Sequence, residues 1–109
     1  MVYPFNAPLL DFLVLSIVRR QDSYGYQISQ QLKGVANMKD STLYPILKRL
    51  SDNGFLDTYD QPFQGRNRKY YRITDSGLEQ CDFLFQEWTS YSEAIGKIID
   101  GKGAEQKNE

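Results

Sequence analysis

The chain has 109 residues, 40% of them hydrophobic and 25% charged, which is typical of a globular protein with one domain or one domain and an appendage. It contains no histidine and one cysteine, which excludes intrachain disulfides, zinc fingers and histidine-dependent catalytic or metal sites. The net charge of −1, taken as a total, argues mildly against DNA binding. The acidic residues are scattered singly and nothing in the sequence pairs them, so we expect no enzyme, no metal and no cofactor.

The first part of the chain combines an irregular arm with an unusually apolar helix. We expect the arm over residues 1–7 and the helix over Leu9–Arg20, which is apolar on nearly every face. Such a helix is buried on several sides, and in so small a protein this predicts that a partner subunit covers part of it. Its apolar run, interrupted by Asp11 and Ser16, is shorter than the ~18 residues of a membrane span and lacks the flanks of a signal peptide. We therefore expect a cytoplasmic protein.

A second helix is predicted from about Tyr24 to Gly34. Asp22 or Ser23 is expected to cap its start, and Gly34 is a plausible residue to end it. A polar turn over residues 37–40 should connect it to the next helix.

A third helix is predicted to begin near Ser41, whose hydroxyl can cap it, and to end at Gly54. Pro45 limits where this helix starts, because proline lacks the N–H that interior positions need. It should therefore lie in or very near the first turn. The buried stripe of this helix is expected to comprise Leu43, Ile46, Leu47 and Leu50.

Two strands are predicted next, over Phe55–Tyr59 and Lys69–Thr74. In the second strand, one face should carry Lys69, Tyr71 and Ile73, and the other Tyr70, Arg72 and Thr74. The intervening Asp60–Asn67 contains a proline and a glycine and looks too long for a tight hairpin, so we expect it to form a loop, the wing. Phe63 in this loop is expected to be exposed, and the pattern assigns it no role.

The last helix is predicted from Asp75 to about Asp100. Apolar residues alternate steps of three and four along it and form a heptad seam of Cys81, Leu84, Trp88, Tyr91, Ile95 and Ile98. The chain thus divides into a winged helix-turn-helix over residues 1–74, a dimerisation helix over 75–100 and a disordered tail over 101–109. The expected fold class is α+β.

The third helix carries polar and basic residues outside its buried stripe. Hydroxyl groups near its start can reach phosphates or a base edge, and two basic side chains one to two turns later would meet the DNA backbone. The candidate DNA-binding residues of this helix are Ser41, Thr42, Tyr44, Lys48 and Arg49. Taken alone, this pattern also fits an ordinary solvent-facing helix.

The segment after this helix is strongly basic. Between Gln61 and Thr74 it has four basic residues and no acidic one. Arg66 and Arg68 at its tip can enter a minor groove or bind phosphates, because phosphate binding depends on the local patch and not on total charge. A basic tip can also be just a solubilised turn. Its position directly after a candidate recognition helix favours sequence-specific DNA binding.

Trp88 lies on the heptad seam and is either an ordinary core or interface residue or part of a ligand site. With its two-fold mate and with aromatic residues of the first and last helices, it can line a flat slot that stacks planar hydrophobic compounds. The candidate effector and dimer-interface residues are Phe12, Leu84, Phe85, Trp88, Tyr91 and Ile95. Cys81 is most simply a small buried hydrophobe; a redox sensor is the alternative.

These residues, in this order, resemble the PadR family of bacterial transcriptional regulators. The matching elements are Tyr24-Gly25-Tyr26, Ser41-Thr42-Leu43-Tyr44-Pro45-Ile46-Leu47-Lys48-Arg49-Leu50, Gly54-Phe55-Leu56, and Arg68-Lys69-Tyr70-Tyr71-Arg72-Ile73-Thr74 followed by Gly77. The single short C-terminal helix resembles the smaller PadR subfamily, and its seam with Trp88 is similar to that of a multidrug-sensing member with a tryptophan-lined pore at the dimer interface.

This resemblance implies a dimer joined through the last helix and parts of the first, which binds pseudo-palindromic operators in double-stranded DNA and usually represses transcription. It also implies recognition-helix contacts by Thr42, Tyr44 and Lys48, and wing contacts by Arg66, Arg68 and Lys69. We therefore expect a dimeric repressor relieved by a small hydrophobic or aromatic effector. The alternatives are a winged-helix protein-interaction scaffold without DNA binding, and an enzyme or small-molecule carrier built around the aromatic seam.

Overall fold

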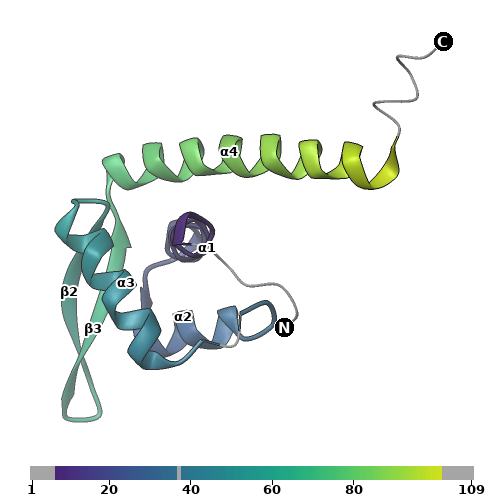
Figure 1. Cartoon of the computed structure of the whole chain (residues 1–109). Helices are drawn as coiled ribbons and strands as arrows, with labels where there is room; N and C mark the ends of the chain where they lie inside the picture. Colours follow the sequence, from purple (N-terminus) through teal and green to yellow (C-terminus); the bar gives the residue numbers. More distant parts are fainter. Residues whose placement is uncertain (1–6, 37, 102–109) are drawn as a thin grey trace.

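The computed structural model describes residues 7–36 and 38–101, which form helices and a three-stranded antiparallel sheet. The elements in chain order are α1 (Ala7–Arg20), β1 (Ser23–Tyr24), α2 (Gly25–Leu32), α3 (Asp40–Asp52), β2 (Leu56–Phe63), β3 (Arg66–Ile73) and α4 (Asp75–Asp100). This is the expected α+β winged helix with an additional C-terminal helix (Figure 1). The predicted arm and tail lie outside the described residues, apart from Ala7, which begins α1, and Gly101, which caps α4.

One hydrophobic core joins all four helices to the sheet. Its buried residues come from α1 (Val14, Leu15, Val18), α2 (Ile28, Leu32), α3 (Leu43, Ile46, Leu47, Leu50), the sheet (Leu56, Tyr71) and α4 (Cys81, Leu84). The stripe predicted for α3 is confirmed in full. The first part of α4 belongs to this core, whereas its remainder extends away from the other elements (Figure 1).

The predicted caps of the second and third helices are wrong. Ser23 is a strand residue that pairs with Tyr71, and its hydroxyl donates to the carbonyl of Gln21, so it cannot cap α2. Tyr24 is the N-cap instead, and its N–H donates to Oε1 of Gln27 at 3.2 Å. α2 is also shorter than expected: it ends at Leu32 and not at Gly34.

The start of α3 also differs from the prediction. The helix begins at Asp40 with Lys39 as its N-cap, so Ser41 lies inside the first turn and does not cap it. Pro45 is consequently an interior residue, beyond the first turn. Only the carbonyl of Ser41 loses its helical donor through this proline, and because Ser41 is exposed, water can replace that donor.

The wing is a tight hairpin, and the predicted long loop over Asp60–Asn67 is wrong. β2 and β3 extend until only Gln64 and Gly65 connect them. Both have positive φ, 52° and 77°, which is the backbone of the two-residue turn that matches strand twist, and glycine adopts it without strain. Pro62 does not end β2, because β2 is an edge strand and proline is tolerated there.

α4 spans the predicted residues and begins with a side-chain cap. Oγ1 of Thr74 accepts a hydrogen bond of 2.9 Å from the N–H of Gly77. In Figure 1, α4 runs across the view while α1 is seen nearly end-on beneath it, so their axes cross steeply. Within the part of the chain that the structure describes, no helix is long and apolar enough to cross a membrane.

Candidate functional site

The five candidate residues of α3 all lie on its exposed side. Ser41, Thr42 and Tyr44 occupy the N-terminal half of the helix, and Lys48 and Arg49 the C-terminal half. This arrangement follows from the buried stripe, which directs every other side chain of α3 outward. Their exposure leaves the hydroxyl groups near the helix start free to act as hydrogen-bond donors and acceptors.

Tyr44 connects α3 to the start of α2. A Cβ atom placed on Gly25, the first residue of α2, would lie 2.5 Å from Oη of Tyr44. No other residue than glycine therefore fits there without moving the ring. Burial raises the pKa of Tyr71 in the core, and the nearby Tyr44 raises it further. The ring of Tyr44 is thus held by the helix-turn-helix, while 45% of the residue stays exposed.

Both basic side chains of α3 already have acidic partners. Nζ of Lys48 lies 2.8 Å from Asp52 one turn later, and this hydrogen bond raises the pKa of Lys48. The guanidinium of Arg49 donates to both carboxylate oxygens of Asp11, at 2.7 and 2.8 Å, which raises the pKa of Arg49. Asp11 belongs to α1, so the Arg49–Asp11 pair joins two helices that the sequence separates by 38 positions.

The structure does not bring the three basic residues of the wing onto one face. Arg66 and Arg68 project from the outer face of the sheet, and Lys69 projects from the opposite face, which also carries the buried Tyr71. Strand alternation dictates this separation. Within the described residues, none of the three forms an ion pair; Lys69 does not do so even with Asp60, its cross-strand neighbour.

Arg68 is held by aromatic rings. Its Cζ lies 3.6 Å from the ring centroid of Phe63 and 3.9 Å from that of Tyr24. Phe63, which sequence reasoning left without a role, therefore has a definite contact. The pattern could not show it, because the contact depends on the extended hairpin.

Further tyrosines continue this arrangement along the outer face of the sheet. The Tyr70 ring packs edge-on against Tyr24 at 5.4 Å and stacks on Tyr59 at 5.6 Å. Oη of Tyr59 donates to Asp22 at 2.6 Å, and this hydrogen bond raises the pKa of Tyr59. We call Tyr24, Tyr59, Phe63 and Tyr70 the aromatic ladder. It connects the wing to the segment that leads into α2.

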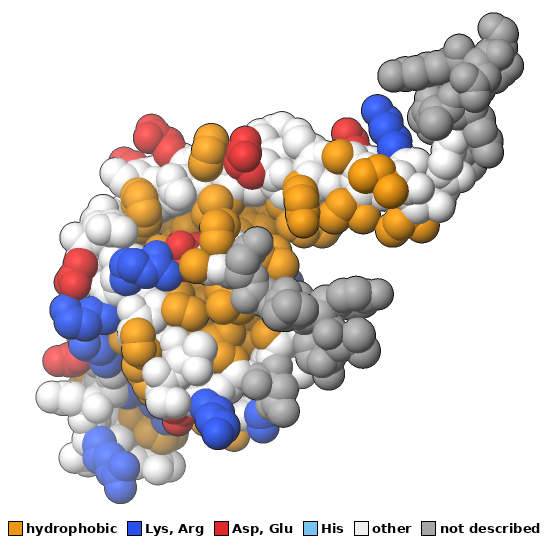
Figure 2. Space-filling view, in the orientation of Figure 1, with side chains coloured by type: hydrophobic (Ala, Val, Ile, Leu, Met, Phe, Trp, Pro, Cys, Tyr) orange, Lys and Arg blue, Asp and Glu red, His pale blue; other side chains and the backbone are white. Residues whose placement is uncertain are grey.

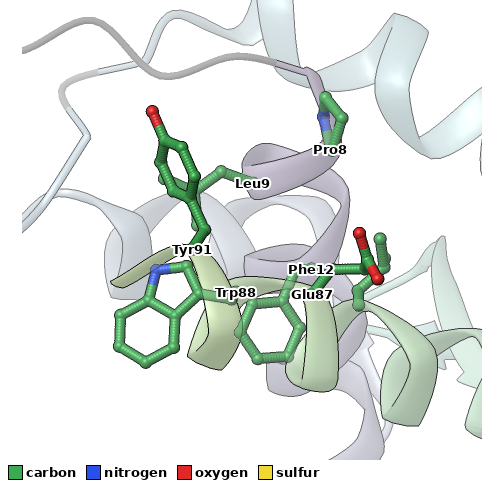
Figure 3. A pocket seen from close by; sticks show the side chains of 7 residues that line it. Pro8, Leu9, Phe12, Glu87, Trp88 and Tyr91 are labelled. Atoms are coloured by element: carbon green, nitrogen blue, oxygen red, sulfur yellow. The ribbon is translucent and has the colours of Figure 1, made fainter. Parts of the chain in front are cut away.

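A second feature is an apolar cavity of about 330 Å³ between the start of α1 and the middle of α4. Figure 3 shows the side chains that line it, which are Pro8, Leu9, Phe12, Leu84, Glu87, Trp88 and Tyr91. The rings of Phe12 and Trp88 are 6.5 Å apart, and Phe12 is 6.1 Å from Phe85. Four of the six predicted effector residues thus line the cavity, Phe85 contacts one of them, and Ile95 lies further along α4.

Beyond the cavity, α4 carries a row of exposed apolar side chains. Tyr91, Ile95, Ile98 and Ile99 are 37–81% exposed. Figure 2 shows hydrophobic side chains along the lower face of α4 and in the hollow beneath it. Cys81 lies on the same seam but is buried, with Oγ of Ser16 3.7 Å from its Sγ, as expected of a small core side chain.

The model of the transcriptional regulator PadR-like family matches residues 14–82, from the middle of α1 into α4. The chain belongs to the PadR-like family. Members of this family are DNA-binding transcription regulators and not enzymes. The matched region includes α3 and the complete wing and stops before Trp88.

Two individual proteins are similar to this chain, and one of them is named PadR. The negative transcriptional regulator PadR of Bacillus subtilis is 33% identical over an alignment of 85 positions, and the match covers 72% of this chain and 46% of that protein. An uncharacterized protein of Lysinibacillus sphaericus is 34% identical over 84% of this chain and 89% of its own length.

Solved structures show the same PadR-like fold. The crystal structure of smu.1704 from Streptococcus mutans UA159 has a TM-score of 0.88 and 51% identity, and the match covers 93% of this chain and 95% of that one. A PadR family transcription regulator from Clostridium difficile R20291 has a TM-score of 0.76 and 29% identity over 83% of this chain and 97% of its own.

Proposed function

We propose that this PadR-like chain is a cytoplasmic homodimeric repressor that binds a pseudo-palindromic DNA operator and is released by a small hydrophobic or aromatic effector. The observation that carries the proposal is the basic hairpin beside the exposed half of α3. Arg66, Arg68 and Lys69 have no acidic partner among the described residues, so their charge is available to phosphate.

In this proposal α3 enters the major groove and the wing contacts the adjacent backbone or minor groove. Ser41, Thr42 and Tyr44 would approach phosphates or base edges, and Lys48 would exchange Asp52 for a phosphate. We leave Arg49 out of the proposed DNA contacts, because Asp11 already binds its guanidinium at two positions. Its role is to hold α1 against α3.

The exposed apolar face of α4 supports dimerisation. Side chains such as Ile98, 81% exposed, and Ile99, 76% exposed, lie in a continuous row with Trp88 and Tyr91. Monomeric proteins rarely expose such a row, and a second copy that packs α4 and the start of α1 against it would remove it from water. We accordingly assign residues 1–74 to DNA binding and 75–100 to dimerisation. The dimer must place its two copies of α3 ~34–36 Å apart, one turn of duplex.

The cavity beside Trp88 supports the effector site. Its volume of about 330 Å³ is near the lower end of the ~300–1,000 Å³ range of ligand pockets. Phe12 and Trp88 offer ring faces for stacking, and Glu87 on its lining favours a neutral or cationic compound over an anion. A ligand that prefers one spacing of the two subunits by ~1–3 kcal/mol would suffice to release DNA.

DNA binding is tested by selecting sites from random duplex DNA with the purified chain, followed by affinity at two salt concentrations. We expect a two-fold-symmetric site whose affinity falls steeply with salt, because phosphate contacts release counterions. Failure to enrich any site, or affinity indifferent to salt, would reject the proposal and favour a protein-interaction scaffold.

The effector site is tested with 2-naphthol, a neutral planar probe, and the sole tryptophan, Trp88, as the fluorescent reporter. We expect quenching of Trp88, and weaker binding by Trp88→Ala than by Trp88→Phe in calorimetry, because phenylalanine keeps a ring. Unchanged affinity and unchanged operator release in Trp88→Ala would reject the site. Binding without any effect on DNA affinity would instead indicate a carrier.

A further inference from the structure

Arg68 differs from the other basic residues of the DNA-binding region in how it is held. Lys48, Arg49 and Arg72 each have a carboxylate within 4.0 Å. Arg66 is exposed and has no acidic partner among the described residues. Arg68 is half-buried, likewise without an acidic partner in this part of the chain, and is fixed by rings instead.

The strand order explains why two rings meet one guanidinium. β3 is the central strand, between β1 with Tyr24 and β2 with Phe63. Across the strands, Tyr24 is paired with Tyr70 and Phe63 with Arg66. Tyr70 and Arg66 each lie two residues from Arg68 on β3, so both rings are diagonal neighbours of Arg68. Diagonal neighbours on one face are within reach of long and aromatic side chains.

This contact leaves the hydrogen-bonding groups of Arg68 available. Aromatic rings attract the flat faces of a guanidinium, whereas its five N–H donors lie in the plane and point from its edge. The rings therefore restrict the rotamers of Arg68 without occupying a donor. A planar fork of donors held in this way matches two oxygens of a phosphodiester.

Tyr24 is held by contacts of its own, and Phe63 lies at the end of β2, where its ring can reach Arg68. Tyr24 is the N-cap of α2, donates its N–H to Gln27 at 3.2 Å and contacts the Tyr70 ring at 5.4 Å. Phe63 ends β2 directly before the turn and is 44% exposed. The core does not account for an apolar side chain at the tip of a basic hairpin, whereas the contact with Arg68 does.

We propose that Phe63 and Tyr24 are positioning residues that hold the guanidinium of Arg68 ready for a phosphate of the DNA backbone. This inference rests on the proposed DNA-binding function. It makes Phe63 part of the DNA-binding apparatus although it touches no DNA. It also ties the wing to the N-terminus of α2, so that wing and helix-turn-helix approach the duplex together.

The test is a double-mutant cycle on affinity for a duplex carrying the selected site. Phe63→Leu keeps an apolar side chain but removes the ring, and we expect about two- to fivefold weaker binding, the strength of an exposed cation–π contact. Phe63→Tyr keeps the ring and should keep the affinity. In an Arg68→Ala background, Phe63→Leu should not weaken binding further. In a Lys69→Ala background, Phe63→Leu should weaken binding as much as in the wild type, because Lys69 lies on the other face. An equal loss in the Arg68→Ala background would overturn the inference.

A second measurement needs no DNA. In the free protein, the Arg68 Nε–Hε resonance should be shifted upfield by the ring currents of Phe63 and Tyr24, and the shift should decrease in Phe63→Leu but not in Phe63→Tyr. If the wild-type chain binds no duplex, the proposed function fails while this spectrum still tests the contact. If the wild type binds DNA but Phe63→Leu leaves both the resonance and the affinity unchanged, the positioning role is wrong. Thermal melting of each variant verifies that the fold is kept.

Discussion

α3 and the β2–β3 hairpin both present basic side chains, but they handle the charge in opposite ways. On α3, Lys48 is paired with Asp52 and Arg49 with Asp11, so the helix surface is nearly neutralised. At the tip of the hairpin, Arg66 and Lys69 lack acidic partners within the described residues and Arg68 packs against two rings, whereas Arg72, further from the tip, lies 4.0 Å from Asp57. α3 is therefore suited to contacts that depend on shape and hydrogen bonds, and the hairpin to attraction of phosphate. The net charge of −1 conceals this division.

The largest effect is expected from removing the charge of the hairpin. Arg66→Ala/Arg68→Ala should weaken operator binding by about 100-fold or more, because each lost charged hydrogen bond is worth ~1.5–3 kcal/mol. The slope of log affinity against log salt should decrease by about two. Fluorescence anisotropy at several salt concentrations measures both.

Lys48→Ala is the matched change on α3. Because Lys48 must first leave Asp52, we expect a smaller loss and a slope change of at most about one. Lys97→Ala, on the last turn of α4, controls for a change in total charge. If Lys48→Ala were as harmful as the double change in the hairpin, the distinction between the two surfaces would be wrong.

An intermediate effect is expected for the pair between Arg49 and Asp11, and it concerns stability. Arg49→Ala and Asp11→Ala should each destabilise the fold, with a coupling of about 1 kcal/mol in a double-mutant cycle, since the bond is bidentate but partly solvent-screened. Urea denaturation measures the free energies of unfolding. Additive effects in the cycle would show that the pair does not stabilise the fold. A loss of DNA affinity in Arg49→Ala larger than in Asp11→Ala would place Arg49 on the DNA.

The smallest effect is expected from Tyr59→Phe, which detaches the aromatic ladder from Asp22. The hydrogen bond to Asp22 raises the pKa of Tyr59 above 10.0, so folding favours the protonated phenol. Its stabilisation is therefore present below pH ~10 and is lost as the pH rises through the native pKa. Melting temperatures from pH 8 to 11 should fall slightly more for the wild type than for Tyr59→Phe. Parallel curves would show that this hydrogen bond does not contribute.

The elements of this protein that depend on local pattern could be predicted from the sequence. The buried stripe of α3, the span of α4 and the two faces of β3 follow from periodicities of 3.6 and 2 residues, which any compact fold must respect. The exposure of Tyr44, Lys48 and Arg66 follows from the same periodicities. Phe12 and Trp88 were expected to line a slot between two subunits, and the structure shows their rings 6.5 Å apart within one chain.

Other features were decided only by pairing between distant segments. Ser23 could have capped a helix, but β1 pairs it with Tyr71. The hairpin became tight because each added pair of residues on β2 and β3 satisfies backbone hydrogen bonds that a loop would leave to water. Neither the pairing of Ser23 nor the tight hairpin can be predicted from neighbouring residues alone.

The sequence by itself determined that the chain has a winged helix with a basic hairpin and an apolar C-terminal helix, because side-chain periodicity and local charge are properties of neighbouring residues. Only the tertiary structure decided that Arg49 binds Asp11 and that Arg68 lies on Phe63 and Tyr24. These contacts arise when the core brings helices and strands together, and they determine which of several similar arginines remain available to DNA.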